Sequence, residues 1–196
     1  MFKNLKIKNA KFFAKGKRGY IYVGDYKGIK VAIKVKNPSS KAENRIENEA
    51  YWLKKLNKYG IGPKFYFLKE NALVYRFVEG QIIKDWLKKS KKEEKKKALL
   101  DILKQLKTMD KLKINKLEMH KPLKHIVINK KPVLIDFERC YRTNKPKNVT
   151  QFFQFLIQQD LINKNKPLIG LLSSYKRHQS DKNFNKIIKY FLEIFS

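Results

Sequence analysis

Apolar and polar residues alternate along positions 5–36, interrupted by a glycine-bearing segment at 14–19 and by Asp25–Gly28. Strands produce this period of two, because successive side chains point to opposite faces of a sheet. The pattern therefore predicts strands joined by tight turns. Two further short strands, KFYFL and NALVYRFV, are expected around a turn at Lys69–Asn71.

A helical period follows the first strands. Within 42–58, the residues Ile46, Ala50, Leu53 and Leu56 recur at intervals of three and four, which places them on one face of a helix. The run Tyr-Gly-Ile-Gly-Pro that comes next predicts the end of that helix, because glycine and proline interrupt helical backbone.

The second half of the chain is mainly helical in its pattern. After Gly80 the segment IIKDWL begins a helix, and a lysine-rich turn at 88–97 leads into a longer one. Residues 126–136 predict two short strands around a tight turn, and helical spacing returns over 149–162 and 183–195. The apolar face of the long helix consists of Leu99, Ile102, Leu103, Leu106 and Met109.

This order of elements predicts an α+β protein with two lobes. A β-rich lobe with one helix is expected over 1–80, and a short, mainly helical lobe over 81–196. A chain of 196 residues is long enough to bury a hydrophobic core and suits one compact unit or two small lobes.

Charge adds a question about partners. The chain has 47 Lys and Arg against 17 Asp and Glu, a net charge of +30, and only six of the basic residues are Arg. One interpretation is a coding bias that leaves solvated lysines over the whole surface. The other is a surface that attracts a polyanion such as RNA or a ribonucleoprotein. Lysines bind phosphate as point charges and read no sequence, so the charge alone decides nothing about chemistry.

Composition narrows the class of protein. The single cysteine, Cys140, excludes an internal disulfide and a cysteine-based zinc site. No run of about 18 apolar residues occurs, so no membrane-spanning helix is expected. The first residues also lack the apolar run of a signal peptide, and a cytoplasmic protein is expected.

Three segments carry candidate chemistry. AKGKRGYI at 14–21 fits the loop G-x-G-x-x-G-x-V, in which glycines let backbone N–H groups approach phosphates, although two glycines also suit a plain hairpin turn. VAIK ends in Lys34, which shares a strand face with Ala32 and needs an anion such as Glu49 on the following helix. VLIDFE places Asp136 after a buried-looking strand, where a carboxylate is costly unless it is paired or binds a metal such as Mg²⁺.

The three segments occur in the same order, and on the same types of element, as the corresponding motifs of protein kinases, so the chain resembles the protein-kinase fold. The resemblance is to the RIO and Bud-type atypical kinases and to a family of small archaeal predicted Ser/Thr protein kinases. It rests on AKGKRGYI, VAIK, NEAYWL, GIGPKFYF, LVYRFVEG and IDFE, over roughly residues 10–160. It implies a minimal bilobal kinase-like fold, with an antiparallel β lobe carrying one helix and a short helical lobe, that uses ATP and Mg²⁺.

The resemblance also implies roles for individual residues. Ala14, Gly16 and Gly19 would form the loop that covers the ATP phosphates. Lys34 would hold the phosphates, and Glu49 would orient Lys34. Contacts to the adenine, the hinge and the ribose would come from Ile21, Ala32, Tyr75, Arg76, Phe77, Val78 and Glu79.

The catalytic loop departs from the kinase pattern H-R-D-x-x-x-x-N. In LEMHKPLKHIVIN, at 117–129, the preferred register places His120 at the position of the catalytic Asp and His125 at that of the metal-binding Asn. The other register places Pro122 and Val127 there. Neither supplies the expected carboxylate, so His120 is the predicted general base because an imidazole titrates near neutral pH.

Other residues complete the predicted site. Asp136 would bind Mg²⁺, together with His125, although an imidazole suits Mg²⁺ less well than an oxygen ligand. Glu118 is the alternative base, and Glu138 replaces the glycine of the Asp-Phe-Gly motif. His178 lies in SSYKRHQSDK, which is expected to be a solvated turn.

The implied function is an ATP- and Mg²⁺-dependent phosphotransferase, a Ser/Thr protein kinase of atypical type that phosphorylates a protein or itself, or hydrolyses ATP slowly. Two other classes remain open. One is a pseudokinase that serves as a nucleotide-binding or structural scaffold. The other is an RNA-associated protein built on a kinase-like fold, and RNA or a ribonucleoprotein is a possible partner in both this class and the first.

Overall fold

The computed structural model describes residues 2–16, 18–41 and 43–195. Contacts divide it into two compact units, one running up to Glu79 and including Val133–Cys140, the other made of Gly80–Pro132 and the residues from Tyr141 onward. Residues 133–140 thus belong to the first unit, although they follow the boundary expected at residue 80.

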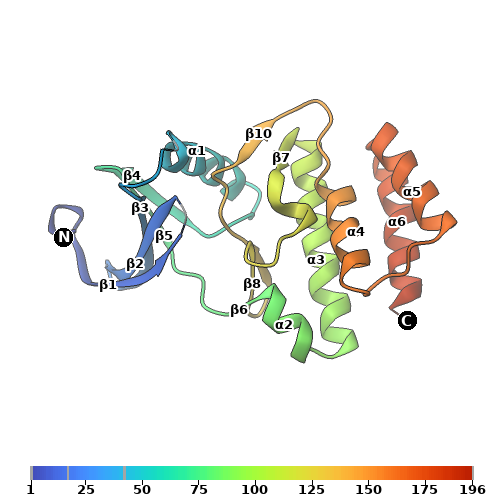
Figure 1. The fold of residues 1–196 in the computed structure, drawn as a ribbon, viewed down its shortest axis with the longest axis horizontal. Coiled ribbons are helices and arrows are strands. Elements are labelled where there is room, and N and C mark those ends of the chain that lie inside the picture. Colours follow the sequence, from blue (N-terminus) through green and yellow to red (C-terminus); the bar gives the residue numbers. More distant parts are fainter. Residues whose placement is uncertain (1, 17, 42, 196) are drawn as a thin grey trace. The chain divides into compact units, whose positions relative to one another are not determined.

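An antiparallel sheet of five strands, in the order β1-β2-β3-β5-β4, builds the first unit (Figure 1). Its turn between β2 and β3 holds Lys27 and Gly28 at positive φ. The strands predicted from alternation and turn residues are confirmed. The elements are β1 (Ile7–Lys15), β2 (Gly19–Tyr26), β3 (Ile29–Lys36), α1 (Arg45–Asn57), β4 (Phe65–Lys69) and β5 (Ala72–Arg76).

The central strand β3 is buried on both faces. On one face, Val31 and Ile33 pack with Val74 in the core of the sheet. On the other face, Ile46 and Ala50 of α1 pack against Leu73 of β5. All four residues predicted to line one face of this helix are buried, so its register follows from their spacing.

The second unit is mainly helical, as predicted. Its long helix α3 presents the five expected apolar residues inward, each with 0% exposed surface. Helices α5 and α6 lie side by side at the C-terminal end of this unit (Figure 1). The elements are β6 (Gln81–Ile82), α2 (Ile83–Lys89), α3 (Lys92–Lys111), β7 (Ile114–Lys116), a 3-10 turn (Leu117–His120), β8 (Ile126–Ile128), α4 (Asn148–Gln158), α5 (Lys166–Arg177) and α6 (Asp181–Ile194). The short strands β9 (Pro132–Leu134) and β10 (Cys140–Arg142) span the boundaries between the units.

The lysine-rich stretch at 88–97 is not a turn, because α3 already begins at Lys92. The backbone N–H of Lys91 donates to Oε2 of Glu94 at 2.7 Å, which caps the helix start. Glu93 and Glu94 add negative charge to the first turn, where the helix dipole favours it. These two interactions stabilise the start of α3, which was hard to recognise in the sequence because the segment is so rich in lysine.

Helix α5 was not predicted, and the segment 173–177, expected to be a turn, forms its last residues. Oδ1 of Asn165 accepts a hydrogen bond from the backbone N–H of Leu168 at 3.0 Å, and Pro167 stands in the first turn. An Asn before Lys-Pro is a helix-start signal that could have been recognised. His178 follows α5 directly and is exposed, as expected.

A buried polar network joins α3, β7 and α4. Nδ2 of Asn148 donates to Oδ1 of Asp110 and to the carbonyl of Ile114, both at 2.7 Å, while its Oδ1 accepts from the backbone N–H of Lys116 at 2.8 Å. The hydroxyl of Tyr175 donates to Asp110 at 3.0 Å. Burial raises the pKa of Asp110, although these hydrogen bonds oppose the rise. The network fixes the backbone that leads into residues 117–129.

Within the described residues, no helix combines the length and the apolar character needed to cross a lipid bilayer.

Candidate active site

Lys34 lies at the centre of a buried ionic cluster in the first unit. Only 7% of its surface is exposed. Its Nζ lies 2.6 Å from Oε2 of Glu49, 3.0 Å from Oδ1 of Asp136 and 3.1 Å from Oε2 of Glu138. A buried ammonium is costly without anions, and three carboxylates from two distant parts of the sequence supply them.

The electrostatics keep Lys34 charged. Burial by itself would lower the pKa of the Lys34 ammonium, but Glu49, Asp136 and Glu138 outweigh it and raise that pKa above its usual value. Burial also raises the pKa of Glu49, against the opposing effect of Lys34. The cluster therefore holds a charged ammonium at a fixed place, among carboxylates that outnumber it.

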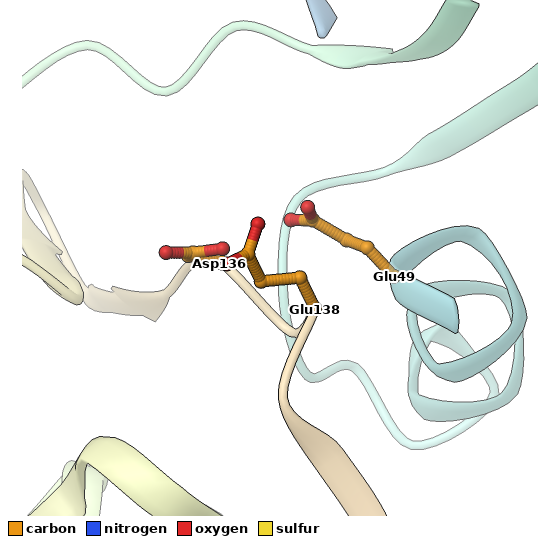
Figure 2. Close-up of side chains that lie close together, drawn as sticks. All are labelled: Glu49, Asp136 and Glu138. Carbon is orange, nitrogen blue, oxygen red and sulfur yellow. The ribbon is translucent and has the colours of Figure 1, made fainter. Parts of the chain in front are cut away.

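Three carboxylates face one another in this cluster. Figure 2 shows Glu49 reaching from α1, and Asp136 and Glu138 from the segment after β9. Their ligand oxygens lie within 4.8 Å of one another. The Asp136 side chain is 33% exposed, while Glu49 and Glu138 are buried. Mg²⁺ prefers oxygen ligands and usually takes one or two carboxylates plus phosphates, so the donor set fits this ion with Asp136 as its accessible ligand.

The backbone at Asp136 lies in the left-handed region, which Asp tolerates better than most residues other than glycine. Its φ is 63°. The next residue, Phe137, donates its N–H to Oε1 of Glu49 at 3.2 Å, and its ring is fully buried. A Cβ on Gly62 would lie 2.9 Å from that ring, so glycine is required there. These contacts hold the backbone around Asp136 in place.

The turn between β1 and β2 packs closely on Lys34. The N–H of Gly16 donates to the carbonyl of Gly19 at 2.8 Å, which closes the turn. A Cβ on Gly19 would lie 2.8 Å from the carbonyl of Val35 and 3.4 Å from Cε of Lys34. Glycine at this position therefore lets the turn approach the cluster. Two residues, Lys17 and Arg18, lie between these glycines in the sequence, and Lys17 is outside the described residues.

The residues predicted to contact the adenine, Ile21, Ala32 and Tyr75, share one face of the sheet with Ala14 and Lys34, which were predicted to lie near the phosphates. Ala14 pairs with Ile21 and Ile21 with Lys34, while Ala32 pairs with Tyr75. Directly paired residues point to the same side, and Ala32 and Lys34 are two residues apart, so all five lie on one face. Loss of solvent around its half-buried ring, followed by the charge of Glu49, raises the pKa of Tyr75.

The predicted hinge residues follow β5. The N–H of Phe77 donates to the carbonyl of Lys30 at 3.1 Å, and the ring of Phe77 packs edge-on against Phe13. Val78 is half-buried, and exposed Glu79 pairs with Lys30 at 2.7 Å, which lowers the pKa of Glu79. These contacts leave the hinge and ribose roles as predictions.

The predicted catalytic-loop residues belong to the second unit. His120 is exposed, with Nδ1 3.0 Å from the carbonyl of Leu117, and His125 is half-buried. Oε2 of Glu118 lies 3.2 Å from Nζ of Lys116, which has 0% exposed surface. The role of each of these residues stays a prediction.

Sequence reasoning missed Arg18. Its Nη1 lies 2.7 Å from Oε1 of Glu138, the residue that replaces the glycine of the Asp-Phe-Gly motif. The two residues are 120 positions apart, and no local pattern indicates that they meet. A second acidic residue next to Asp136 was the one available signal that further cations would gather there.

Solved structures of similar shape exist. A crystal structure of the Rio2 kinase–ADP/Mg²⁺–phosphoaspartate complex from Chaetomium thermophilum matches with a TM-score of 0.61 and 12% identity, covering 98% of this chain and 73% of that one. The fold is kinase-like. A structure described as a kinase domain matches with a TM-score of 0.59 and 16% identity, over 70% of this chain and 53% of that one.

These similarities show the fold and nothing finer, because the identities are low. The predicted α+β, kinase-like architecture is confirmed. No family model and no curated protein sequence matches the chain. The relation to Bud-type kinases and to an archaeal family stays a prediction.

Proposed function

We propose that this protein binds ATP with Mg²⁺ and transfers a phosphoryl group. The observation that carries the proposal is the 2.6 Å contact between Lys34 and Glu49 beside Asp136, in a kinase-like fold. One of the structures with this fold was solved with ADP and Mg²⁺. A buried, fixed ammonium next to an accessible carboxylate matches the needs of a nucleotide phosphate and its metal ion.

Three residues of the cluster and the glycine turn each have a distinct task in this proposal. Glu49 orients the Lys34 ammonium, which would hold the phosphates. The glycine turn at 16–19 would bring backbone N–H groups close to them. Asp136 would hold Mg²⁺, which neutralises negative charge on the phosphates when bound.

His120 is the proposed general base. A carbonyl oxygen can only accept, so Nδ1 of His120 is the donor toward Leu117, and in the neutral ring this makes Nε2 the acceptor. The acceptor of the phosphoryl group would be a Ser or Thr hydroxyl of a protein, of this chain itself, or water. His125 would be the second metal ligand, although its nitrogen is a weaker partner for Mg²⁺ than oxygen.

A nucleotide-binding scaffold without phosphotransfer is the second candidate. The observation that favours it is that Glu118, the one carboxylate in the segment 117–129, pairs with the buried Lys116 instead of standing alone as a base. The lobes expected over 1–80 and 81–196, and a ribonucleoprotein partner, remain predictions under either candidate.

Thermal unfolding of the purified chain tests nucleotide binding. A ligand that binds only the folded state stabilises it, by about 2.7 kcal/mol at a concentration 100 times its Kd. We expect Mg-ATP to raise the Tm, and Asp136→Asn to remove the part of that rise that depends on Mg²⁺. Glu47→Gln, an exposed change on α1, is the control and should keep the full rise. An equal rise in wild type and Asp136→Asn would contradict the site.

Phosphate release separates the two candidates. If the wild-type protein releases phosphate from ATP or phosphorylates itself, and Asp136→Asn does not, the result supports the phosphotransferase. A Tm rise with no phosphate transfer over prolonged incubation supports the scaffold and refutes the transferase.

A further inference from the structure

A strongly basic cavity of about 780 Å³ lies in the second unit. Three segments form it: the link after α3, the stretch before α4, and the end of α5. Its remaining lining is polar, and among the described residues no Asp or Glu lines it. The cationic side chains that line it are Lys113, Lys145, Lys147, Lys176 and Arg177.

Hydrogen bonds hold the three segments in place. The N–H of Thr143 donates to the carbonyl of Lys113 at 2.9 Å, and the N–H of Lys147 donates to Oδ1 of the buried Asn115 at 2.7 Å. Nε2 of Gln179 donates to the carbonyl of Pro146 at 2.6 Å, which ties the end of α5 to the stretch before α4. The cavity is therefore a fixed feature of this unit and not a gap between loose lysines.

The carboxylates nearest in sequence do not neutralise these cations. Asp110 has no exposed surface and accepts hydrogen bonds from Asn148 and Tyr175. Asp181 pairs with Lys107 at 3.2 Å. The positive charge of the cavity is thus available to an anion from outside.

We propose that this cavity binds the phosphodiester backbone of a nucleic acid. Its five cations, with no Asp or Glu among the described lining residues, are complementary to a polyanion, and lysines bind phosphates as point charges. Lys145, Lys147, Lys176 and Arg177 are exposed and spread over two segments, which suits a row of phosphates better than one compact anion.

The residues that line the cavity also indicate that it does not recognise the bases of a nucleic acid. Among the described residues no Phe, Tyr or Trp lines the cavity, and the imidazole of His178 is its one aromatic ring, so it lacks a platform on which successive bases could stack. Binding through phosphates alone is insensitive to sequence and strongly dependent on salt. None of the proposed ATP-binding residues lines the cavity, so this inference stands independently of the proposed function.

Fluorescence anisotropy of a labelled oligouridylate, titrated with the full chain at several salt concentrations, tests the proposal. The variant is Lys145→Gln, Lys147→Gln and Lys176→Gln combined. Its control, Lys84→Gln, Lys88→Gln and Lys89→Gln on α2, removes the same charge from exposed lysines elsewhere in this unit. Each phosphate that a cation neutralises on a single strand adds about 0.7 to the slope of log binding constant against log salt. The cavity variant should therefore show a slope shallower by about 2, and the control an unchanged slope.

The outcomes separate the proposal from its rivals. Equal reductions in both triple variants, or no reduction in either, would overturn it, because binding would then be a property of net charge. Polyglutamate, tripolyphosphate and unlabelled oligouridylate are also compared as competitors at equal concentrations of negative charge. If polyglutamate or tripolyphosphate displaces the labelled oligouridylate as well as unlabelled oligouridylate does, the proposal is overturned. Equal competition by oligothymidylate would support a site that reads the backbone. An unchanged Tm in both variants confirms that folding is intact.

Discussion

In the first unit, four segments of the chain meet at Lys34, and Glu49, Asp136 and Glu138 lie within 3.1 Å of its ammonium. In the second unit, the segment predicted to be the catalytic loop presents an exposed His120, and its carboxylate, Glu118, is paired with a buried lysine. The ionic side chains predicted to hold phosphates and metal thus lie within contact of one another, while the residues predicted to move a proton depart from the kinase pattern. Binding of ATP and transfer of its phosphate are therefore separate claims, and substitutions in the two units can test one against the other.

The largest effect is expected from Lys34→Met. It leaves three carboxylates around an uncharged side chain, and removing one partner of a buried ion pair costs about 3–5 kcal/mol. Urea unfolding measures this loss of stability. Lys36→Met is the matched control, since Lys36 lies two residues along the same strand and is exposed, and a surface change there should cost within about 0.5 kcal/mol. Equal stability of the two variants would mean that the cluster does not hold the first unit together.

In the second unit, the largest effect is expected from His120→Ala on phosphate transfer. A general base contributes about 10²–10⁴-fold to a rate, so turnover of ATP should fall by at least about 100-fold with the Tm nearly unchanged. His178→Ala is the control, because this histidine is also exposed but lies beyond α5.

Glu118→Gln completes that comparison. Turnover that survives His120→Ala and disappears in Glu118→Gln would transfer the role of base to Glu118. The Tm of the Glu118 variant must be measured alongside, because Glu118 also neutralises Lys116 in the interior.

A smaller effect is expected from Asn148→Ala. Without the amide, the carbonyl of Ile114 and the N–H of Lys116 lose a buried partner, while Asp110 still accepts from the hydroxyl of Tyr175. An unsatisfied buried group costs about 1–3 kcal/mol, and we expect a loss of about 2 kcal/mol, the low end for two such groups. Asn163→Ala, at an exposed position, should change stability little. If Asn148→Ala lowers stability but leaves ATP-induced stabilisation intact, the two units contribute separately, as the contrast between them implies.

The helix and strands of the first unit could be predicted from the sequence because the patterns that indicate them are local. Alternation, glycine turns and the spacing of Ile46 and Ala50 on α1 each act over a few residues, and Lys34 and Glu49 are only 15 positions apart. Helix α5 escaped prediction because much of its surface is polar and its start is marked only by Asn165 and Pro167. No short pattern could reveal that Arg18 meets Glu138, or that Asp136 takes a positive φ, because the surrounding tertiary structure dictates both.

Among the substitutions of buried residues, the smallest loss of stability and the most local effect are expected from Glu138→Gln. The amide keeps the shape of the side chain but loses the charge that attracts Arg18 at 2.7 Å and Lys34 at 3.1 Å. The same change relieves repulsion with the two other carboxylates, so the net loss should be only about 1 kcal/mol.

The informative readout for Glu138→Gln is local, because Glu138 connects the glycine turn to the cluster through Arg18. Amide hydrogen exchange at Gly16, whose N–H is bonded within the turn, should become faster, while exchange in the core strand β3 stays slow. Glu79→Gln is the control, since Glu79 also pairs with a lysine, but on the surface. If exchange at Gly16 is the same in wild type, Glu138→Gln and Glu79→Gln, the turn is held by its own backbone hydrogen bonds. The residues predicted to hold phosphates would then depend on fewer long-range contacts than the ionic cluster suggests.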